Sequence, residues 1–451
     1  MSEIVVKIDP SKHINESSKD FSIYTCEYRA IPNIADGLKD SQRKALYVIK
    51  PIQGKIKTIS LAGEMISSNL YLHGDVSAAG AISGMAAPYD NNVCWLDGIG
   101  TFGTKTFPKE IASPRYTYVK KSHILEEIMY VDNDIVPMKE NYDGSRLQPA
   151  HFLPIIPTVL LNSTSGIAVG WSTDILPRSL HSLIDASIKV LDGKKLTDLQ
   201  PDYTYLNVVT KKISDDVWEF YGRLTRSTYD TIYVTDLPPE VDCEVIKERL
   251  IELENNKVIL DFTDRSSKTT NIEIKLPRGT LAEKTDEQLL SMLKLVTRKT
   301  DRLVVIDWDG KTIRKMNSAI DIVTEFVTKR LTYYKLRYKQ LLDVTSTELV
   351  YWECLKKCHD NGIYAKLKNI QSRQELTDII RLTCPNISDE NCIKIESLPL
   401  YKWSRDEYTV VTNKIVELKN TITSYTDIYN SEDKQRDIYK SELVKLRKLV
   451  K

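Results

Sequence analysis

Basic side chains gather in two segments of the first third of the chain, and clustered Lys and Arg residues are the groups that contact phosphate. One cluster runs from Arg29 to Lys57, with seven basic and two acidic residues. The other runs from Lys105 to Lys121, with five basic residues and one acidic residue. Residues 58–104 between them contain no Lys or Arg. The pattern predicts a phosphate-binding surface on one packed module, although two solvated faces of unrelated helices would give the same composition.

A glycine motif after residue 97 offers a second kind of chemistry. Gly98, Gly100 and Gly103 match the G-x-G-x-x-G fingerprint of dinucleotide-binding proteins. That fingerprint needs a helix directly after it to receive the pyrophosphate. Here Pro108 and Pro114 follow instead. Nucleotide binding at this loop is therefore kept only as a minor alternative.

Two other motifs are weaker still. The Gly-Lys-Thr sequence at 310–312 is similar to the end of a Walker motif, but Val305 stands where the first glycine belongs. Cys354, Cys358 and His359 have helical spacing, yet no second pair of ligands has the spacing of a metal site. We interpret these thiols as core residues.

Composition limits the classes of protein to which the chain can belong. With 451 residues, 41% of them hydrophobic and 28% charged, it is typical of a soluble globular protein of about two to four domains. The 63 basic and 62 acidic residues leave a net charge of +1, so any basic surface must be local. The most apolar run, residues 152–161, is interrupted by two prolines and is too short to span a membrane.

Localisation and redox state are predicted from similar arguments. The first residues, MSEIVVKIDPSK, lack the apolar core of a signal peptide, so we expect a cytoplasmic protein. The seven cysteines are scattered and odd in number. This distribution predicts reduced thiols.

The elements that must position the basic clusters can be read from periodicity. Residues 59–69 and 75–87 have helical patterns around a short turn, with Asp75 as the expected N-cap, which predicts a helix-turn-helix unit. From about 155 to 315 the pattern predicts an α/β or α+β module, with strands at 167–171, 205–209, 231–235 and 303–307 and helices at 245–255 and 286–295. Asp309-Gly310 predicts a hairpin turn.

The last third has heptad periodicity in two runs, 327–355 and 411–450. A continuous second helix would be roughly 60 Å long. Residues 363–404 between the runs contain two prolines and must form a small separate unit. We therefore expect two long helices that run out and back, as in a dimerisation arm or a mechanical spacer.

Several motifs, in this order, resemble the signature stretches of one family: Arg29 to Asn33, Asp36 to Lys39, Gln42 to Lys44, Tyr71 to Asp75, Leu96 to Gly103, Ala112 to Tyr118, Ser165 to Gly170 and Ser397 to Tyr401. Together they are similar to the type IIA DNA topoisomerases, the family of the gyrase A subunit, over nearly the whole chain. The sequence departs from the bacterial pattern at Gln42 and Tyr71, which replace histidines. It also ends at the second long helix, without a DNA-wrapping, ATPase or metal-binding module.

The resemblance implies a mixed α/β multidomain fold. Its parts would be a winged-helix (helix-turn-helix) DNA-binding domain, an α/β tower domain and a long antiparallel coiled coil that ends in a small helical gate. The implied boundaries are an N-terminal arm at 1–20, the winged-helix domain at 21–154, the tower at 155–315, the coiled coil at 316–362 and 405–451, and the gate knob at 363–404.

The resemblance also implies the catalytic residues. Tyr116 would attack a DNA phosphodiester, with Arg115, Arg29 and His73 stabilising the phosphate and handling the phenolic proton. A free phenol has a pKa of about 10, so its ionisation at pH 7 costs roughly 4 kcal/mol that neighbouring groups must supply. Positive charge and a base are therefore needed near Tyr116.

Four further residues are implied in DNA binding. Lys39, Arg43 and Lys44 would contact phosphates, which gives affinity with little sequence preference. Ile167 would be a wedge inserted between base steps to kink the duplex. Without the resemblance, Ile167 would be interpreted as a core residue of a strand.

The implied partners are double-stranded DNA, a second copy of the chain, and one or more ATPase and metal-binding subunits, with no membrane. No convincing carboxylate cluster is visible, so Mg²⁺ and ATP are expected on the partner subunit. The implied activity is that of an ATP-dependent type II DNA topoisomerase that cuts both strands and lets another duplex pass. Two alternatives remain: a non-catalytic DNA-binding scaffold of the same architecture, and a nucleotide-binding enzyme that uses Gly98, Gly100 and Gly103.

Overall fold

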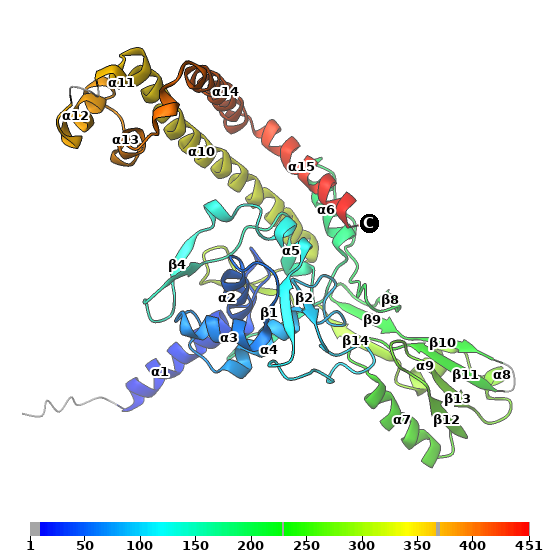
Figure 1. Cartoon of the computed structure of the whole chain (residues 1–451). Helices are drawn as coiled ribbons and strands as arrows, with labels where there is room; N and C mark the ends of the chain where they lie inside the picture. Colours follow the sequence, from blue (N-terminus) through cyan, green and yellow to red (C-terminus); the bar gives the residue numbers. More distant parts are fainter. Residues whose placement is uncertain (1–9, 228–229, 367–369, 451) are drawn as a thin grey trace, which may run out of the picture. The chain divides into compact units, whose positions relative to one another are not determined.

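The computed structural model describes residues 10–227, 230–366 and 370–450. Contacts divide the chain into two compact units, one formed by Met1–Arg330 with Glu442–Lys451 and the other by Leu331–Ser441. Figure 1 shows the whole chain, with labels on the helices and strands for which there is room. The fold is mixed α/β, as the sequence predicts.

The first unit begins with helices that pack around a small sheet. The helices are α1 (Pro10–Thr25), the π-helix η1 (Cys26–Ala30), α2 (Asp40–Ile49), α3 (Thr58–Ser67), α4 (Asp75–Met85) and α5 (His123–Ile128). The sheet is antiparallel, with β3 (Tyr118–Lys121) between β1 (Ile56–Lys57) and β2 (Leu96–Ile99). Both predicted helices of the helix-turn-helix unit are confirmed. The predicted N-cap is wrong by one residue, because Gly74 holds that position and Asp75 begins α4.

Short elements follow the sheet: η2 (Asn133–Ile135), β4 (Met138–Glu140), β5 (Leu147–Pro149), η3 (Thr158–Leu160), β6 (Thr164–Ile167), β7 (Ser172–Ile175) and α6 (Leu180–Leu191). Strands β6 and β7 form a hairpin in which Ile167 pairs with Ser172. The predicted strand 167–171 is therefore wrong, since most of it forms the turn. Gly170, with φ of 77°, adopts the left-handed conformation that this turn requires.

Two antiparallel sheets and three helices make up most of residues 200–300. One sheet has the order β14-β9-β8 (Val296–Thr300, Val217–Tyr221, Val209–Lys212) and the other β10-β11-β13-β12 (Arg223–Arg226, Thr231–Asp236, Ile272–Lys275, Asp261–Asp264). The helices are α7 (Cys243–Asn255), α8 (Thr280–Glu283) and α9 (Asp286–Met292). Strand 231–235 and both predicted helices are confirmed, whereas the predicted strand 205–209 is wrong because β8 only begins at its last residue.

A second hairpin joins this region to the long helices. It pairs β15 (Val304–Ile306) with β16 (Ile313–Lys315) around the turn that contains Asp309 and Gly310. Asp309 stabilises the turn by accepting hydrogen bonds from the backbone of Lys311 and Thr312, each at 2.9 Å. The predicted hairpin and strand are confirmed.

The heptad runs form antiparallel helices. The first is α10 (Ala319–Asp360), whose later part belongs to the second unit; the others are α14 (Arg405–Asn430) and α15 (Glu432–Leu449). Their direction follows from ring pairs at 5.0 Å, between Tyr334 and Tyr439, and at 5.6 Å, between Tyr338 and Tyr425. The prediction of one continuous helix over 411–450 is wrong. Ser431 has extended backbone, and its hydroxyl caps the start of α15.

The remaining helices of the second unit are α11 (Ile363–Lys366), α12 (Arg373–Thr383), α13 (Asp389–Glu396) and η5 (Leu400–Trp403). Their core contains Cys354, Cys358, Cys384 and Cys392. Cys354 and Cys384 form a disulfide with 5.7 Å between their Cα atoms. The prediction of reduced thiols is therefore wrong for this pair, because the fold brings together two cysteines that lie 30 residues apart.

Within residues 10–227, 230–366 and 370–450, no helix combines the length and apolar character needed to cross a membrane.

Candidate functional site

Tyr116 lies on an exposed turn whose next residue is anchored in the interior. Its side chain is 66% exposed, and its backbone N–H donates to the carbonyl of Ser113 at 2.9 Å. Thr117 and Thr58 are both buried, and their hydroxyls share a hydrogen bond of 2.8 Å. The backbone N–H of Thr58 also donates to the carbonyl of Thr117 at 3.0 Å. The start of α3 thus fixes the turn while leaving the phenol accessible.

Arg115 supplies a positive charge to this phenol. Its guanidinium carbon lies 4.8 Å from the ring centroid of Tyr116. Both side chains are exposed, so the pair can meet a large ligand without rearrangement of the core. A guanidinium remains charged at any physiological pH and can stabilise negative charge on a phenolic or phosphate oxygen.

The glycine loop has a packing role beside this turn. Gly103 has φ of 80°, and a Cβ there would lie 2.6 Å from the carbonyl oxygen of Pro108. The loop is joined to the Tyr116 segment by the bridge between Phe102 and Ile111. The next element in the chain is strand β3 and not a helix. These contacts count against a dinucleotide site, because nothing in the loop is arranged to receive a pyrophosphate.

Arg29, Lys39 and His73 come together around a cavity of about 590 Å³ that also has the hydroxyls of Ser41 and Ser77 in its wall. The ammonium of Lys39 donates to the carbonyl of Ser165 at 2.6 Å, and burial lowers its pKa. A cavity lined by two cations and two hydroxyls is suited to phosphate. Tyr116 does not line it.

His73 is held as a neutral base in this cavity. Its pKa is lowered from the ordinary value of 6.5, first by burial and then by the nearby charges of Arg29 and Lys44. Its Nε2 atom is hydrogen-bonded to the hydroxyl of Tyr24. The lowered pKa favours the neutral imidazole at pH 7.

Arg43 and Lys44 lie in the interior, not on the surface. Arg43 pairs with Asp36 through its Nε at 2.6 Å, and Lys44 pairs with Asp40 at 2.8 Å. All four side chains are less than 10% exposed. Both charges are already neutralised by ion pairs away from solvent, so the phosphate contacts predicted for these two residues would require the pairs to open.

Ile167 stands at the tip of the β6–β7 hairpin with 87% of its surface exposed. The hairpin lies directly on the end of η1: a Cβ on Gly166 would be 2.1 Å from the carbonyl oxygen of Ala30. Val169 and Trp171, also exposed, extend the apolar tip. An isoleucine this exposed contributes nothing to the core, so the core interpretation of Ile167 is wrong.

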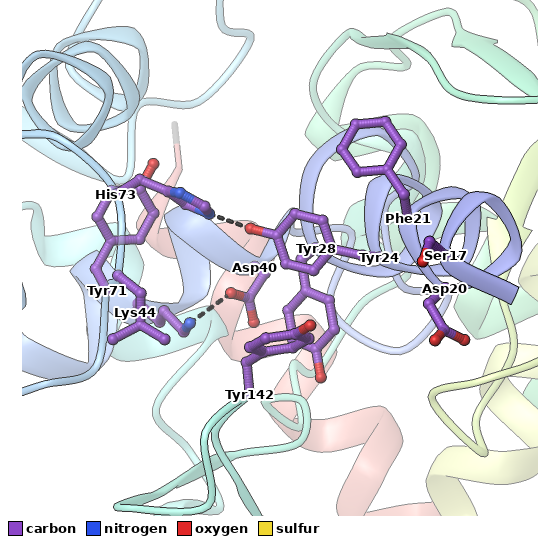
Figure 2. A pocket seen from close by; sticks show the side chains of 11 residues that line it. Ser17, Asp20, Phe21, Tyr24, Tyr28, Asp40, Lys44, Tyr71, His73 and Tyr142 are labelled. Carbon is purple, nitrogen blue, oxygen red and sulfur yellow. Dashed lines mark hydrogen bonds and ion pairs between the residues drawn. The ribbon is translucent and has the colours of Figure 1, made fainter. Parts of the chain in front are cut away.

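A group of aromatic side chains beside Arg29 was not predicted from the sequence. The guanidinium carbon of Arg29 lies 5.3 Å from the ring centroid of Tyr24, which stacks on Tyr28 at 5.3 Å. Tyr142 packs edge-on against both rings. Figure 2 shows these side chains around a second cavity. The four-residue spacing of Tyr24 and Tyr28 was the only available signal, because Tyr142 comes from a distant segment.

Comparisons with known proteins agree on one family. Residues 29–444 match the model of the DNA gyrase/topoisomerase IV A-subunit family. Over 356 residues the chain is 31% identical to the DNA topoisomerase medium subunit of Enterobacteria phage T4, which covers 77% of this chain and 78% of that relative. The motifs of the sequence predict this likeness to a T-even-type phage protein, and the comparison confirms it.

Cellular enzymes are also similar. DNA topoisomerase 2-alpha of Homo sapiens is 30% identical over 334 residues, which are 71% of this chain and 22% of that enzyme. The DNA-binding, cleavage and re-ligation domain of Plasmodium falciparum topoisomerase II has the same fold, with a TM-score of 0.85 at 22% identity. That match covers 97% of this chain and 63% of the other.

Proposed function

The chain belongs to the DNA gyrase/topoisomerase IV A-subunit family, and we propose on that basis that it is the subunit that breaks and rejoins DNA in a type II DNA topoisomerase. The observation that carries the proposal is Tyr116, an exposed phenol on an anchored turn with the guanidinium of Arg115 at 4.8 Å. The family match supports the enzyme class, and the geometry of the turn supports the choice of nucleophile.

In the proposed step the phenolic oxygen of Tyr116 attacks a backbone phosphorus of the DNA. An O–P bond forms between tyrosine and one strand, the bond from phosphorus to the 3′ oxygen breaks, and that oxygen takes up a proton. The phosphotyrosine link conserves the energy of the broken ester, so rejoining is the reverse reaction and needs no separate input of energy. Arg115 would stabilise the charge that develops during transfer.

The site is proposed to be shared between two copies of the chain. Arg29 and His73 are suited to hold the phosphate and to accept the phenolic proton, but Tyr116 does not line their cavity. We infer that Tyr116 of one copy works with Arg29 and His73 of a second copy. A dimer would then carry two composite sites, one for each strand of a duplex.

Mixed dimers test this arrangement. A dimer that combines one Tyr116→Phe chain with one Arg29→Ala chain is expected to nick one DNA strand, because one of its composite sites keeps both residues. If each site is built within a single chain, the mixed dimer has no complete site and cleaves neither strand. The measurement is nicking of supercoiled plasmid by affinity-purified mixed dimers, with the two single-variant homodimers as controls. Absence of nicking in the mixed dimer contradicts the shared site.

DNA binding is proposed to use the surface around the basic cavity. Lys39 and Arg29 would contact phosphates, and Ile167 would insert between base steps. The hairpin that carries Ile167 is linked to Lys39 through the hydrogen bond to Ser165. Phosphate contacts and the wedge would therefore act on the same stretch of duplex.

Ile167→Ala is expected to reduce DNA bending and to lower cleavage about tenfold or more, because the wedge offsets an unstacking cost of a few kcal/mol. Fluorescence energy transfer between the ends of a labelled duplex measures the bend. The fold should be unaffected, because the side chain is 87% exposed. Ile251→Ala is a matched control, since Ile251 is an isoleucine that is 50% exposed in α7 and lines neither cavity. Unchanged bending in Ile167→Ala would rule out the wedge.

The larger parts are assigned by the same proposal. Residues 21–154 would be a winged-helix domain and 155–315 a tower domain. The N-terminal arm expected at 1–20 lies partly outside the described residues, which begin at Pro10. The antiparallel helices at 316–362 and 405–451 would be the coiled-coil arm, and 363–404 the knob through which two copies meet. The exposed Leu382, Leu400 and Tyr401 support a contact surface in the knob.

Mg²⁺ and ATP are proposed to be bound by partner subunits. Among the residues that the structure describes, no three His, Cys, Asp or Glu side chains are grouped as metal ligands. The phage relative is named a medium subunit, which implies an enzyme of several polypeptides. Bound Mg²⁺ would neutralise charge on the transferring phosphate. We propose that the assembled enzyme works in the cytoplasm, where its DNA lies.

Trapping of the covalent intermediate tests the function. The chain is mixed with its partner, Mg²⁺ and plasmid labelled throughout with radioactive phosphate, denatured rapidly with detergent, and examined for labelled protein. A denaturation-resistant adduct, with a nucleotide remnant on the peptide containing Tyr116 after nuclease digestion, supports the proposal. Absence of any adduct favours the non-catalytic scaffold, which would still bind DNA.

A further inference from the structure

An aromatic cavity of about 540 Å³ opens between α1, η1, α2 and the turn before α4. Six ring side chains line it: Phe21, Tyr24, Tyr28, Tyr71, His73 and Tyr142. Figure 2 shows that these rings come from separate segments and surround a common space. The volume lies in the range of small-molecule sites, which are mostly apolar with a few polar groups.

The rings are held in defined positions. Tyr24 and Tyr28 stack with an interplanar angle of 19°, and Tyr142 meets them edge-on at 5.2 and 5.8 Å. The hydroxyl of Tyr24 is bonded to His73, and the ring of Tyr71 meets His73 edge-on at 5.2 Å. Such an arrangement is preorganised for a flat ring, which prefers stacked or edge-on contact with aromatic side chains.

Charge close to the rings comes mainly from cations, although Asp20 also lines the cavity. The guanidinium of Arg29 lies 5.3 Å from the ring centroid of Tyr24, and the ammonium of Lys139 lies 5.2 Å from that of Tyr28. Asp40, which also lines the cavity, is neutralised by its ion pair with Lys44. Cations already occupy positions near these rings, so a neutral or anionic aromatic ligand is favoured over an ammonium group.

The aromatic cavity adjoins the basic one. Tyr28, Tyr71 and His73 line both, so a single ligand could extend across them. The basic cavity is also lined by Arg29, which is a cation, and by Ser77, which has a hydroxyl. One cavity thus offers ring surfaces and the next offers phosphate-binding groups. A nucleotide has both parts, a flat base and an attached phosphate.

We propose that the aromatic cavity binds a nucleobase whose phosphate lies in the basic cavity, so that the two cavities together hold one nucleoside monophosphate unit. The unit could be a free nucleotide or an unpaired nucleotide of a DNA strand. The inference deepens the proposed function, because the basic cavity is the same one that is assigned to a DNA phosphate. Fully paired bases remain in their stack and cannot enter.

Calorimetric titration of the full chain tests the proposal with three probes: thymidine 5′-monophosphate, a single-stranded oligonucleotide and the matching fully paired duplex. Tyr142→Ala is expected to weaken single-strand binding about five- to 100-fold, the usual effect of removing one stacking ring. Tyr142→Phe keeps the ring and should bind within about twofold of wild type, since stacking does not need the hydroxyl. Tyr233→Ala is the control, because Tyr233 is a partly exposed tyrosine of strand β11 that lines neither cavity.

The probes also distinguish a free nucleotide from an unpaired nucleotide of a DNA strand as the ligand. Ring-dependent binding of both the mononucleotide and the single strand supports a site that accepts free nucleotide. Ring-dependent binding of the single strand alone supports an unpaired nucleotide of DNA. Equal affinity of wild type and Tyr142→Ala for every probe, or no binding of either unpaired probe, overturns the proposal. The titration measures binding and not cleavage. Its result can therefore be interpreted even if no covalent adduct forms at Tyr116.

Discussion

Tyr116→Phe is expected to abolish DNA cleavage and the covalent adduct, with a loss of at least about 10⁴-fold, while DNA affinity stays within about twofold of wild type. The substitution removes only the oxygen that forms the bond to phosphorus. The ring remains, and with it the contact of Arg115 at 4.8 Å. Because the side chain is 66% exposed, no buried contact is lost. Relaxation of supercoiled plasmid and fluorescence anisotropy with labelled duplex measure the two quantities.

Tyr118→Phe is the matched control for this experiment. Tyr118 lies two residues further on, in β3, and its ring also carries a cation, the ammonium of Lys55 at 5.1 Å. Its phenol is not on the exposed turn, so cleavage should continue at the wild-type rate. Adduct formation by Tyr116→Phe, or its loss in Tyr118→Phe, would show that Tyr116 is not the nucleophile.

Asp36→Ala is expected to destabilise the first unit by about 3–5 kcal/mol, the usual cost of leaving a buried charge without its partner. The carboxylate of Asp36 accepts two hydrogen bonds from Arg43, at 2.6 and 2.9 Å, and two from the backbone N–H groups of Leu38 and Phe152, both at 3.0 Å. Its removal leaves the buried guanidinium with only the longer contact to Asp40, at 3.9 Å, which Asp40 shares with Lys44. Protection of α2 amides from hydrogen exchange, followed with increasing urea, measures the loss for this region.

Two companion variants sharpen the stability test. Asp36→Ala combined with Arg43→Met should recover part of the loss, because no unpaired charge then remains in the interior. Asp198→Ala removes the partner of Lys212, an ion pair of similar length, 2.7 Å, at an exposed position. Water screens that pair, so no measurable loss is expected. An Asp36→Ala variant as stable as Asp198→Ala would contradict the structural role of the pair with Arg43.

The Tyr116 and Asp36 experiments separate the chemistry of one basic segment from the architecture of the other. Asp36 and Arg43 hold the loop in which Leu38 is followed by Lys39, whose ammonium lines the basic cavity. Loss of the buried ion pair between Asp36 and Arg43 should therefore reduce DNA affinity, because Lys39 would be misplaced. Substitution of Tyr116 should leave DNA affinity unchanged.

Local patterns in the sequence were sufficient for several features. The helices at 59–69 and 245–255, the hairpin at Asp309 and the family motif around Tyr116 depend on residues within a few positions of one another. Their periodicity, turn chemistry and residue order are visible before folding. The family could also be recognised from the sequence, because the resemblance depends on the order of short motifs along the chain. The family match over residues 29–444 confirms it.

Only the tertiary structure decided which of the basic residues face solvent and which meet each other. Arg43 and Lys39 look alike in the sequence, yet one is neutralised by Asp36 and the other lines a cavity. The backbone donor from Phe152 that completes the buried pair lies 116 residues from Asp36. Burial and ion pairing depend on partners that distant segments bring together, and single-sequence patterns contain no record of those contacts. For the same reason the separation of Tyr116 from the Arg29 cavity, and the cavity beside Tyr142, emerged only from the folded chain.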